Sequence, residues 1–259
     1  NNIPWFLNRL GIVKNSELFL ENILKTKINK NQNNQITKGN IQFKNVSFKY
    51  PGSEDYILKD VNTYFKANNK IGIIGPSGSG KSTIMKLLLR MNKIQQGEIL
   101  VDGINIDNIN INHLRERVIY INQKTSLFNT SILENILYGN PQIKEKDVIN
   151  IIQKYNLSTI YQELKKGIYE EAGVSGSNLS LGMQKVTILL RGIFKEGKIV
   201  IFDEPLAGLD SNTRIKVIKM IKNECKNKTV LIITHDKEII PYCDEVMNIT
   251  DIKNNRKNS

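Results

Sequence analysis

Short, continuous apolar runs recur along the chain, with helical patterns between them. The runs lie at residues 70–75, 118–121, 198–203 and 229–234. Runs of this length without polar interruption are typical of strands that are buried on both faces of a sheet. Their alternation with helical patterns predicts an α/β body with a mainly parallel central sheet.

A different pattern marks the start of this body. Residues 41–50 alternate between apolar and polar positions, and residues 57–66 predict a second strand, so we expect an N-terminal antiparallel β portion. The apolar phase shifts between Phe43 and Val46, which would require a β-bulge. Residues 131–195 show several helical patterns and no strong strand, and they predict an inserted helical subdomain.

Polar segments set the expected domain bounds. Residues 25–40 are rich in Asn and Lys, which is typical of a flexible linker. The body then runs over residues 41–251, and residues 252–259 form a polar tail. Residues 1–24 are too short to be a domain, so we interpret them as the end of an upstream element that the linker joins to the body.

Composition excludes several classes of protein. With 40% hydrophobic and 24% charged residues, the 259-residue chain is neither collagen-like, nor a coiled coil, nor wholly disordered. Cys225 and Cys243 are far apart and form no CxxC pair, which excludes a disulfide scaffold and a zinc ribbon. No run of about 18 apolar residues occurs, so no membrane span is predicted. The net charge of +12 fits a polyanionic partner or scattered surface lysines, and the spread of lysines along the chain favours the second.

A glycine-rich segment between an apolar run and a helical run fits the pattern GxxxxGK[ST]. Its residues are Gly75, Pro76, Ser77, Gly78, Ser79, Gly80, Lys81 and Ser82. Glycines let the backbone amides wrap around phosphate oxygens, and the following helix adds its positive N-terminal end. Lys81 would reach the β- and γ-phosphates and the Ser82 hydroxyl would bind Mg²⁺, with Thr83 completing the site.

Polar residues follow three of the apolar runs. Asp203 and Glu204 end the run at 198–203, His235 follows the run at 229–234, and Gln123 follows the run at 118–121. Ligands of parallel sheets bind at the carboxyl ends of the strands. Asp203 is placed to hold Mg²⁺, and Glu204 to polarise a water for attack on a γ-phosphate. His235 could contact the γ-phosphate or that water, and Gln123 the Mg²⁺ or the water. An ordinary surface Asp-Glu pair and a turn histidine are the alternatives.

At these residues the chain resembles the nucleotide-binding domain of an ATP-binding cassette (ABC) transporter, over about residues 41–250. The matching positions are Tyr50, Gln123, Leu179–Met183, Ala207–Asp210 and His235. The resemblance implies ATP and Mg²⁺ as cofactors and ATP hydrolysis as the activity. It implies that Tyr50 stacks on adenine, that Gln123 couples the site to a membrane domain, and that His235 is the switch histidine. The residues after Gln123 resemble the exporter pattern.

The resemblance also implies a head-to-tail dimer, in which the signature of one domain closes over the ATP held by the other. Ser180 and Gly182 of the signature are present, but Leu181 replaces its first glycine and Met183 its glutamine. Val174 stands where exporters carry a glutamate before the signature. A side chain at 181 restricts the approach of the backbone to phosphate. We therefore hypothesise that the site closed by this signature hydrolyses ATP slowly, or that the domain has a better-equipped partner.

The function implied is that of the ATPase domain of an ABC exporter, which dimerises on ATP and powers transport across a membrane. Its partners would be a second nucleotide-binding domain and a transmembrane domain, without nucleic acid. Residues 1–24 would be the end of the last membrane helix, and the domain would lie on the cytoplasmic, matrix or stromal side. Two alternatives stay open: a soluble ABC ATPase that acts on nucleic acid or ribosomes, and a weakly hydrolysing regulatory cassette.

Overall fold

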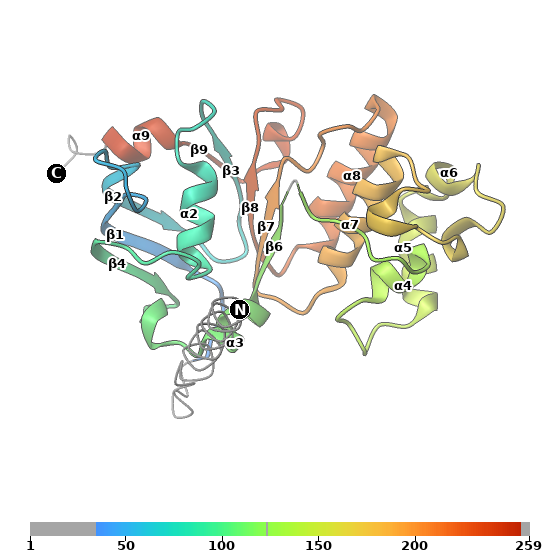
Figure 1. The fold of residues 1–259 in the computed structure, drawn as a ribbon, viewed down its shortest axis with the longest axis horizontal. Coiled ribbons are helices and arrows are strands. Elements are labelled where there is room, and N and C mark those ends of the chain that lie inside the picture. Colours follow the sequence, from blue (N-terminus) through green and yellow to red (C-terminus); the bar gives the residue numbers. More distant parts are fainter. Residues whose placement is uncertain (1–34, 123, 255–259) are drawn as a thin grey trace, which may run out of the picture. The chain divides into compact units, whose positions relative to one another are not determined.

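The N-terminal part of the body is an antiparallel sheet. We describe a computed structural model of residues 35–122 and 124–254, in which the sheet has the strand order β2-β1-β4-β5 (Figure 1). Its strands are β1 (Ile41–Phe48), β2 (Leu58–Phe65), β4 (Gln96–Val101) and β5 (Ile104–Asn105). The register between β1 and β2 shifts between Phe43 and Val46, so the predicted bulge is confirmed. Strands β4 and β5 were not predicted.

The second sheet is parallel throughout and has the strand order β6-β7-β8-β3-β9. Its strands are β3 (Lys70–Ile74), β6 (Val118–Ile121), β7 (Ile199–Asp203), β8 (Thr229–Ile233) and β9 (Glu245–Asn248). The four predicted apolar runs form β3, β6, β7 and β8, of which β6 is an edge strand, and β8 is buried along its whole length. The edge strand β9 was missed because its residues are only partly covered or exposed, which leaves no continuous apolar run.

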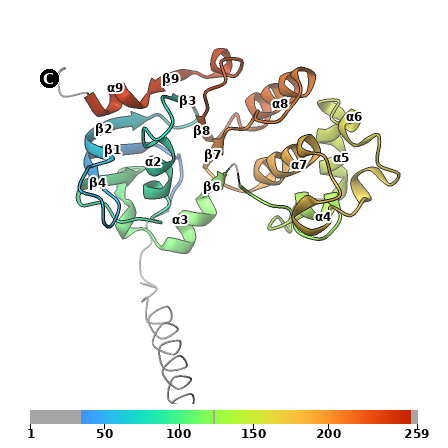
Figure 2. The same ribbon diagram turned by 45° about the horizontal axis from the view of Figure 1, so that its top comes forward.

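One hydrophobic core joins the two sheets around helix α2 (Lys81–Leu88). The helix buries Ile84, Met85, Leu87 and Leu88. The same core takes in residues of β1, β3 and β8, so the helix that follows the glycine-rich loop is held by both sheets. Figure 2 shows α2 between the antiparallel sheet and the parallel one.

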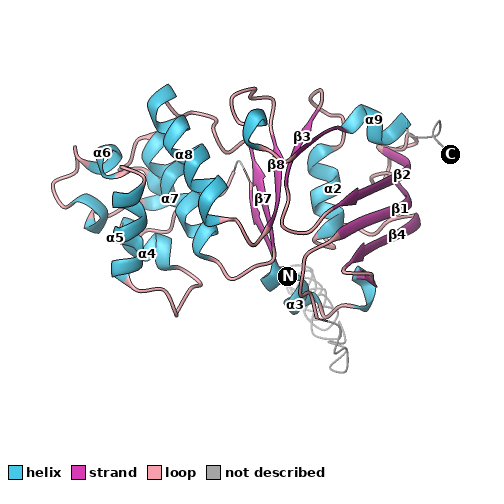
Figure 3. Cartoon of the chain, turned by 180° about the vertical axis from the view of Figure 1, so that it is seen from behind, coloured by secondary structure: helices cyan, strands magenta, loops and turns pink. Residues whose placement is uncertain are grey.

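The predicted helical insertion lies on the other side of the parallel sheet (Figure 3). Its helices are α4 (Ile132–Leu137), α5 (Glu145–Lys154), α6 (Ser158–Tyr161) and α7 (Leu181–Phe194), and α8 (Ser211–Glu224) packs beside them. Within residues 131–195, all of which the structure describes, the only strand-like pairing is an isolated bridge between Ser131 and Glu171. Arg191 fastens α7 to α4, because its Nε donates to the backbone oxygen of Asn135 at 2.8 Å.

Shorter helices complete the body. They are α3 (Ile111–Arg117), α9 (Ile249–Asn254) and the 3₁₀ turns at Ile106–Asn108, Gly167–Tyr169, Val174–Gly176 and Ile240–Tyr242. Helix α9 carries the body past the predicted end at residue 251. Both cysteines are free, and no helix among residues 35–122 and 124–254 has the length and hydropathy to span a membrane.

The last residues of the predicted linker are packed against the body. Ile36 is 3% exposed, and the Asp102 carboxylate accepts hydrogen bonds from the backbone N–H groups of residues 37–40 at 2.8–3.1 Å. Burial alone would raise the pKa of Asp102, but these hydrogen bonds lower it below its usual value. The flexible linker predicted for residues 25–40 is therefore wrong for its last residues. Residues 1–34, with the predicted upstream helix end, and residues 255–259 of the tail lie outside the described residues.

Candidate nucleotide and magnesium site

The glycine-rich loop joins β3 to α2 and curls back on itself. Gly75, Gly78 and Gly80 have φ values of +145°, +74° and +99°, which are backbone conformations that favour glycine. The Lys81 ammonium donates to the backbone oxygens of Gly75 at 2.7 Å and Pro76 at 2.8 Å. The Lys81 ammonium therefore lies at the N-terminus of α2. The positive end of the helix macrodipole and the free backbone N–H groups of the first turn are at the same place.

The residues of this loop fit a polyphosphate with Mg²⁺. An added side-chain carbon at Gly78 would meet no described atom within 4 Å, so a ligand can approach the backbone there. The buried Ser79 Oγ has no hydrogen-bond partner among the described residues, and it is a donor available to a ligand. Ser82 supplies a hydroxyl oxygen and Asp203 carboxylate oxygens, which are the donors that Mg²⁺ prefers.

Tyr50 lies beside the first turn of α2. Its hydroxyl is 3.1 Å from Thr83 Oγ1, and its ring packs edge-to-face on Phe48 with the centroids 5.0 Å apart. The Lys86 ammonium lies 5.9 Å from the ring centroid. The aromatic residue expected to stack on adenine is therefore adjacent to the loop expected to bind phosphates, although the two are 25 or more residues apart in the chain.

Glu204 directly follows Asp203, the last residue of β7, and lies beside the end of β8, which leads to Thr234 and His235. Its Oε1 is 2.8 Å from His235 Nδ1, and its Oε2 accepts from Thr234 Oγ1 at 3.1 Å. The backbone of Glu204 has φ +50°, an unusual value for a residue with a side chain, and its N–H donates to Ile233 O at 2.8 Å. The Glu204 side chain is 16% exposed and the His235 side chain is 81% exposed. The pair thus consists of a largely buried carboxylate and a solvent-exposed imidazole.

Two residues that the sequence did not single out lie at Asp203. The Tyr120 hydroxyl donates to Asp203 Oδ2 at 2.8 Å. Burial, together with that carboxylate, raises the pKa of Tyr120 above its usual range. Burial lowers the pKa of Lys185 on α7, while the charges of Asp203 and Glu204 act in the opposite direction. Neither residue belongs to a motif, and only the pairing of β6 with β7 and the packing of α7 bring them to this edge.

The signature residues lie at the start of α7, on the other side of the parallel sheet from the glycine-rich loop (Figure 1). Ser180 is the N-cap, and its Oγ accepts from the Met183 N–H at 3.3 Å. Leu181 is 73% exposed and Val174 70% exposed, whereas Met183 is 6% exposed. Within one chain the two motifs do not form one site. Gln123 lies outside the described residues, so its position is untested.

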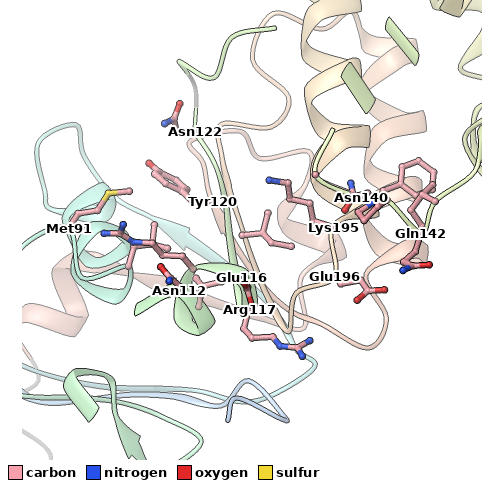
Figure 4. Close-up of a pocket in the computed structure, with 18 residues that line it drawn as sticks. Met91, Asn112, Glu116, Arg117, Tyr120, Asn122, Asn140, Gln142, Lys195 and Glu196 are labelled. Carbon is pink, nitrogen blue, oxygen red and sulfur yellow. The ribbon is translucent and has the colours of Figure 1, made fainter. Parts of the chain in front are cut away.

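A groove of about 930 Å³ lies beside β6 (Figure 4). One wall comes from α3, including Arg115 and Arg117, and the opposite wall from Lys195 and Glu196 after α7. Tyr120, Asn122 and the loop at residues 139–143 also line it. The groove thus has charged residues of both signs and apolar residues in its lining, and it lies next to the residues that lead into position 123.

Comparisons with known proteins agree with this arrangement. A family model for ABC transporters matches residues 58–207. ABC transporter B family member 4 of Dictyostelium discoideum is 36% identical over 220 residues, which cover 84% of this chain and 29% of that protein. The alpha-hemolysin translocation ATP-binding protein HlyB of Escherichia coli O157:H7 is 34% identical over 231 residues, which cover 88% of this chain and 33% of that protein.

A solved structure gives the same result in three dimensions. A bacterial Atm1-family ABC exporter with ATP bound superposes with a TM-score of 0.81 at 26% identity, over 93% of this chain and 43% of that chain. The chain spans about a third of the length of the two curated relatives named above. With the parallel sheet, the antiparallel portion and the helical insertion in place, the chain belongs to the ABC transporter family, as a nucleotide-binding domain of the exporter type.

Proposed function

We propose that this domain binds ATP with Mg²⁺, hydrolyses it, and in doing so powers transport by an exporter. The observation that carries the proposal is the contact between Glu204 and His235, 2.8 Å apart at the carboxyl edge of the sheet, which also bears Asp203 and leads into the glycine-rich loop. A carboxylate and an imidazole in contact, next to a phosphate-binding loop, suit the activation of water for in-line attack on a γ-phosphate.

Each residue has a part in this reaction. Lys81 and the loop amides stabilise negative charge on the β- and γ-phosphates. Ser82 and Asp203 would hold Mg²⁺, which supplies further charge neutralisation when bound. Glu204 orients the attacking water and accepts its proton. A neutral His235 that donates from Nδ1 to Glu204 presents Nε2 as an acceptor for the water, and a protonated His235 presents it as a donor to phosphate.

We also propose two protein partners. A second nucleotide-binding domain would place its signature over the ATP held here, because the loop and the signature of one chain lie on opposite sides of the sheet. A transmembrane domain would dock in the groove beside β6, which is lined by Asn122, the neighbour of the glutamine to which the family resemblance gives the coupling role. The domain would then lie on the cytoplasmic, matrix or stromal face of its membrane, joined through residues 1–24.

The test is the substitution Glu204→Gln in the full-length protein. It removes the proton acceptor and keeps the shape, so ATP turnover should fall by about 10²- to 10⁴-fold while ATP still binds and still drives dimerisation. Glu163→Gln, an exposed glutamate in the helical portion, is the matched control and should leave turnover unchanged. Turnover by Glu204→Gln equal to that of the unaltered protein would contradict the proposal.

A weakly hydrolysing regulatory cassette is the second candidate. The exposed Leu181 at the start of α7 favours it, because an apolar side chain stands where the family resemblance puts a glycine that faces phosphate. The two candidates differ in rate and share the ATP-binding site, so turnover per dimer separates them.

A further inference from the structure

We propose that Tyr120 is a positioning residue for this ATPase reaction: its hydroxyl fixes the Asp203 carboxylate in the orientation that binds Mg²⁺. The inference rests on the proposed function, in which Asp203 is a magnesium-binding residue. It assigns a role to a side chain that lies in no sequence motif and that the preceding mechanism does not use.

The contact between the two side chains is direct. Tyr120 Oη donates to Asp203 Oδ2 at 2.8 Å, which is the usual distance of an O–H···O hydrogen bond. The two residues come from neighbouring parallel strands, β6 and β7, whose register pairs Ile121 with Phe202. Both strands belong to the rigid central sheet, so the donor and the acceptor are held in place by backbone pairing and do not depend on a loop.

This hydrogen bond can set the direction of the carboxylate. The outer torsion angle of an aspartate side chain is broad, so an unrestrained Asp203 could rotate. Because Oδ2 accepts from the tyrosine hydroxyl, rotation of the carboxylate is restricted. The lone pairs that remain free on Asp203 then have a fixed orientation. A carboxylate that is already oriented loses less conformational freedom when Mg²⁺-bound ATP arrives.

The other end of Tyr120 serves a different purpose. Its ring lines the groove beside β6, together with Asn122, as Figure 4 shows. The ring of Tyr120 forms part of the groove lining, whereas its hydroxyl donates the hydrogen bond to Asp203. The substitution Tyr120→Phe therefore separates the two, because it keeps the ring and removes the hydroxyl that donates to Asp203.

The experiment measures ATP affinity of the full-length Tyr120→Phe protein twice, once with Mg²⁺ and once with EDTA. We expect the affinity in Mg²⁺ to fall about three- to tenfold, which corresponds to the loss of one hydrogen bond, and the affinity in EDTA to stay unchanged. We also expect association with the transmembrane domain to be retained, because the ring remains in the groove. These readouts do not depend on turnover.

The matched control is Tyr138→Phe, which removes the hydroxyl of an exposed tyrosine whose ring packs on Phe128 with centroids 4.3 Å apart. It should change neither affinity. An unchanged affinity of Tyr120→Phe in Mg²⁺ overturns the inference, and so does an equal loss in Mg²⁺ and in EDTA, which would indicate a merely structural role. If the unaltered protein itself fails to bind ATP, the proposed function fails first and this inference falls with it.

Discussion

Two helices of this domain begin at sequence patterns associated with phosphate, but their first turns are built differently. Helix α2 follows Gly80, which has φ +99° and carries no side chain to cap the helix. Helix α7 follows Ser180, whose Oγ accepts from the N–H of Met183 at 3.3 Å. Both helices have the positive end of a macrodipole, but α2 leaves its first amides to a ligand and α7 satisfies one with its own side chain.

The residue after each cap strengthens this contrast. Helix α2 continues with Lys81, whose ammonium bends back over the loop, whereas α7 continues with Leu181, which is 73% exposed. The first helix therefore adds charge to its N-terminus, and the second adds an apolar surface. Both helices thus have the same positive N-terminal end. Whether that end can bind phosphate depends on which side chains lie next to its free backbone N–H groups.

Of the changes at these two helices, the largest effect should come from removing the charge at α2. Lys81→Ala should weaken ATP binding by about 10- to 100-fold, because it removes a charged hydrogen-bond donor from the phosphates. Titration with labelled ATP in Mg²⁺ measures this. Lys219→Ala, on the exposed face of α8, removes the same charge elsewhere and should bind ATP as the unaltered protein does. Undiminished affinity in Lys81→Ala would remove the basis for treating α2 as the phosphate site.

A smaller effect should come from making α7 more like α2. Leu181→Gly should raise ATP turnover of the assembled dimer about three- to tenfold, because the backbone at the start of α7 can then come closer to a phosphate. Leu181→Ala removes the apolar bulk but keeps Cβ, and it should give a smaller gain. A flat rate in both variants would show that Leu181 is tolerated and that the contrast between the helices does not control the reaction.

Met183 should not be changed in the same experiment. Its side chain is 6% exposed and belongs to the core of the helical portion, so Met183→Gln would bury an amide at a cost of about 1–3 kcal/mol unless it finds a partner. The exposed Leu181 is therefore the cleaner of the two departures to test.

The smallest effect concerns the cap of α7 itself. Ser180→Ala should lower the free energy of unfolding by about 1 kcal/mol, because the Met183 N–H loses its acceptor. Ser180→Thr keeps a hydroxyl and should recover most of this. Denaturant unfolding curves for the two variants provide the measurement, and equal stability of Ser180→Ala and the unaltered protein would mean that water replaces the cap without loss.

Much of the fold could be predicted because it depends on local patterns. Continuous apolar runs mark strands buried on both faces, and the shift between Phe43 and Val46 marks a bulge that the register of β1 and β2 confirms. The positions of Lys81 and Glu204 could be placed at one sheet edge, because the carboxyl ends of parallel strands meet there. The strand and bulge predictions need only the sequence. The placement of Lys81 and Glu204 needs in addition the inference that the central strands are parallel.

The remaining contacts depend on which strands are neighbours, which one sequence does not contain. Tyr120 contacts Asp203 only because β6 pairs with β7, and Thr234 contacts Glu204 only because β8 lies on the other side of β7. Lys185 reaches the same edge through the packing of α7. No spacing along the chain signals these residues, since 83 residues separate Tyr120 from Asp203.

The clamp formed by Asp102 has a mechanical consequence. Its carboxylate accepts hydrogen bonds from four successive backbone N–H groups just before β1. Ile36, which precedes these residues, is buried in the core. Tension applied to the chain upstream would therefore act first on the buried Ile36 side chain and then on the hairpin of β4 and β5, in which Asp102 is a turn residue, before it reached β1.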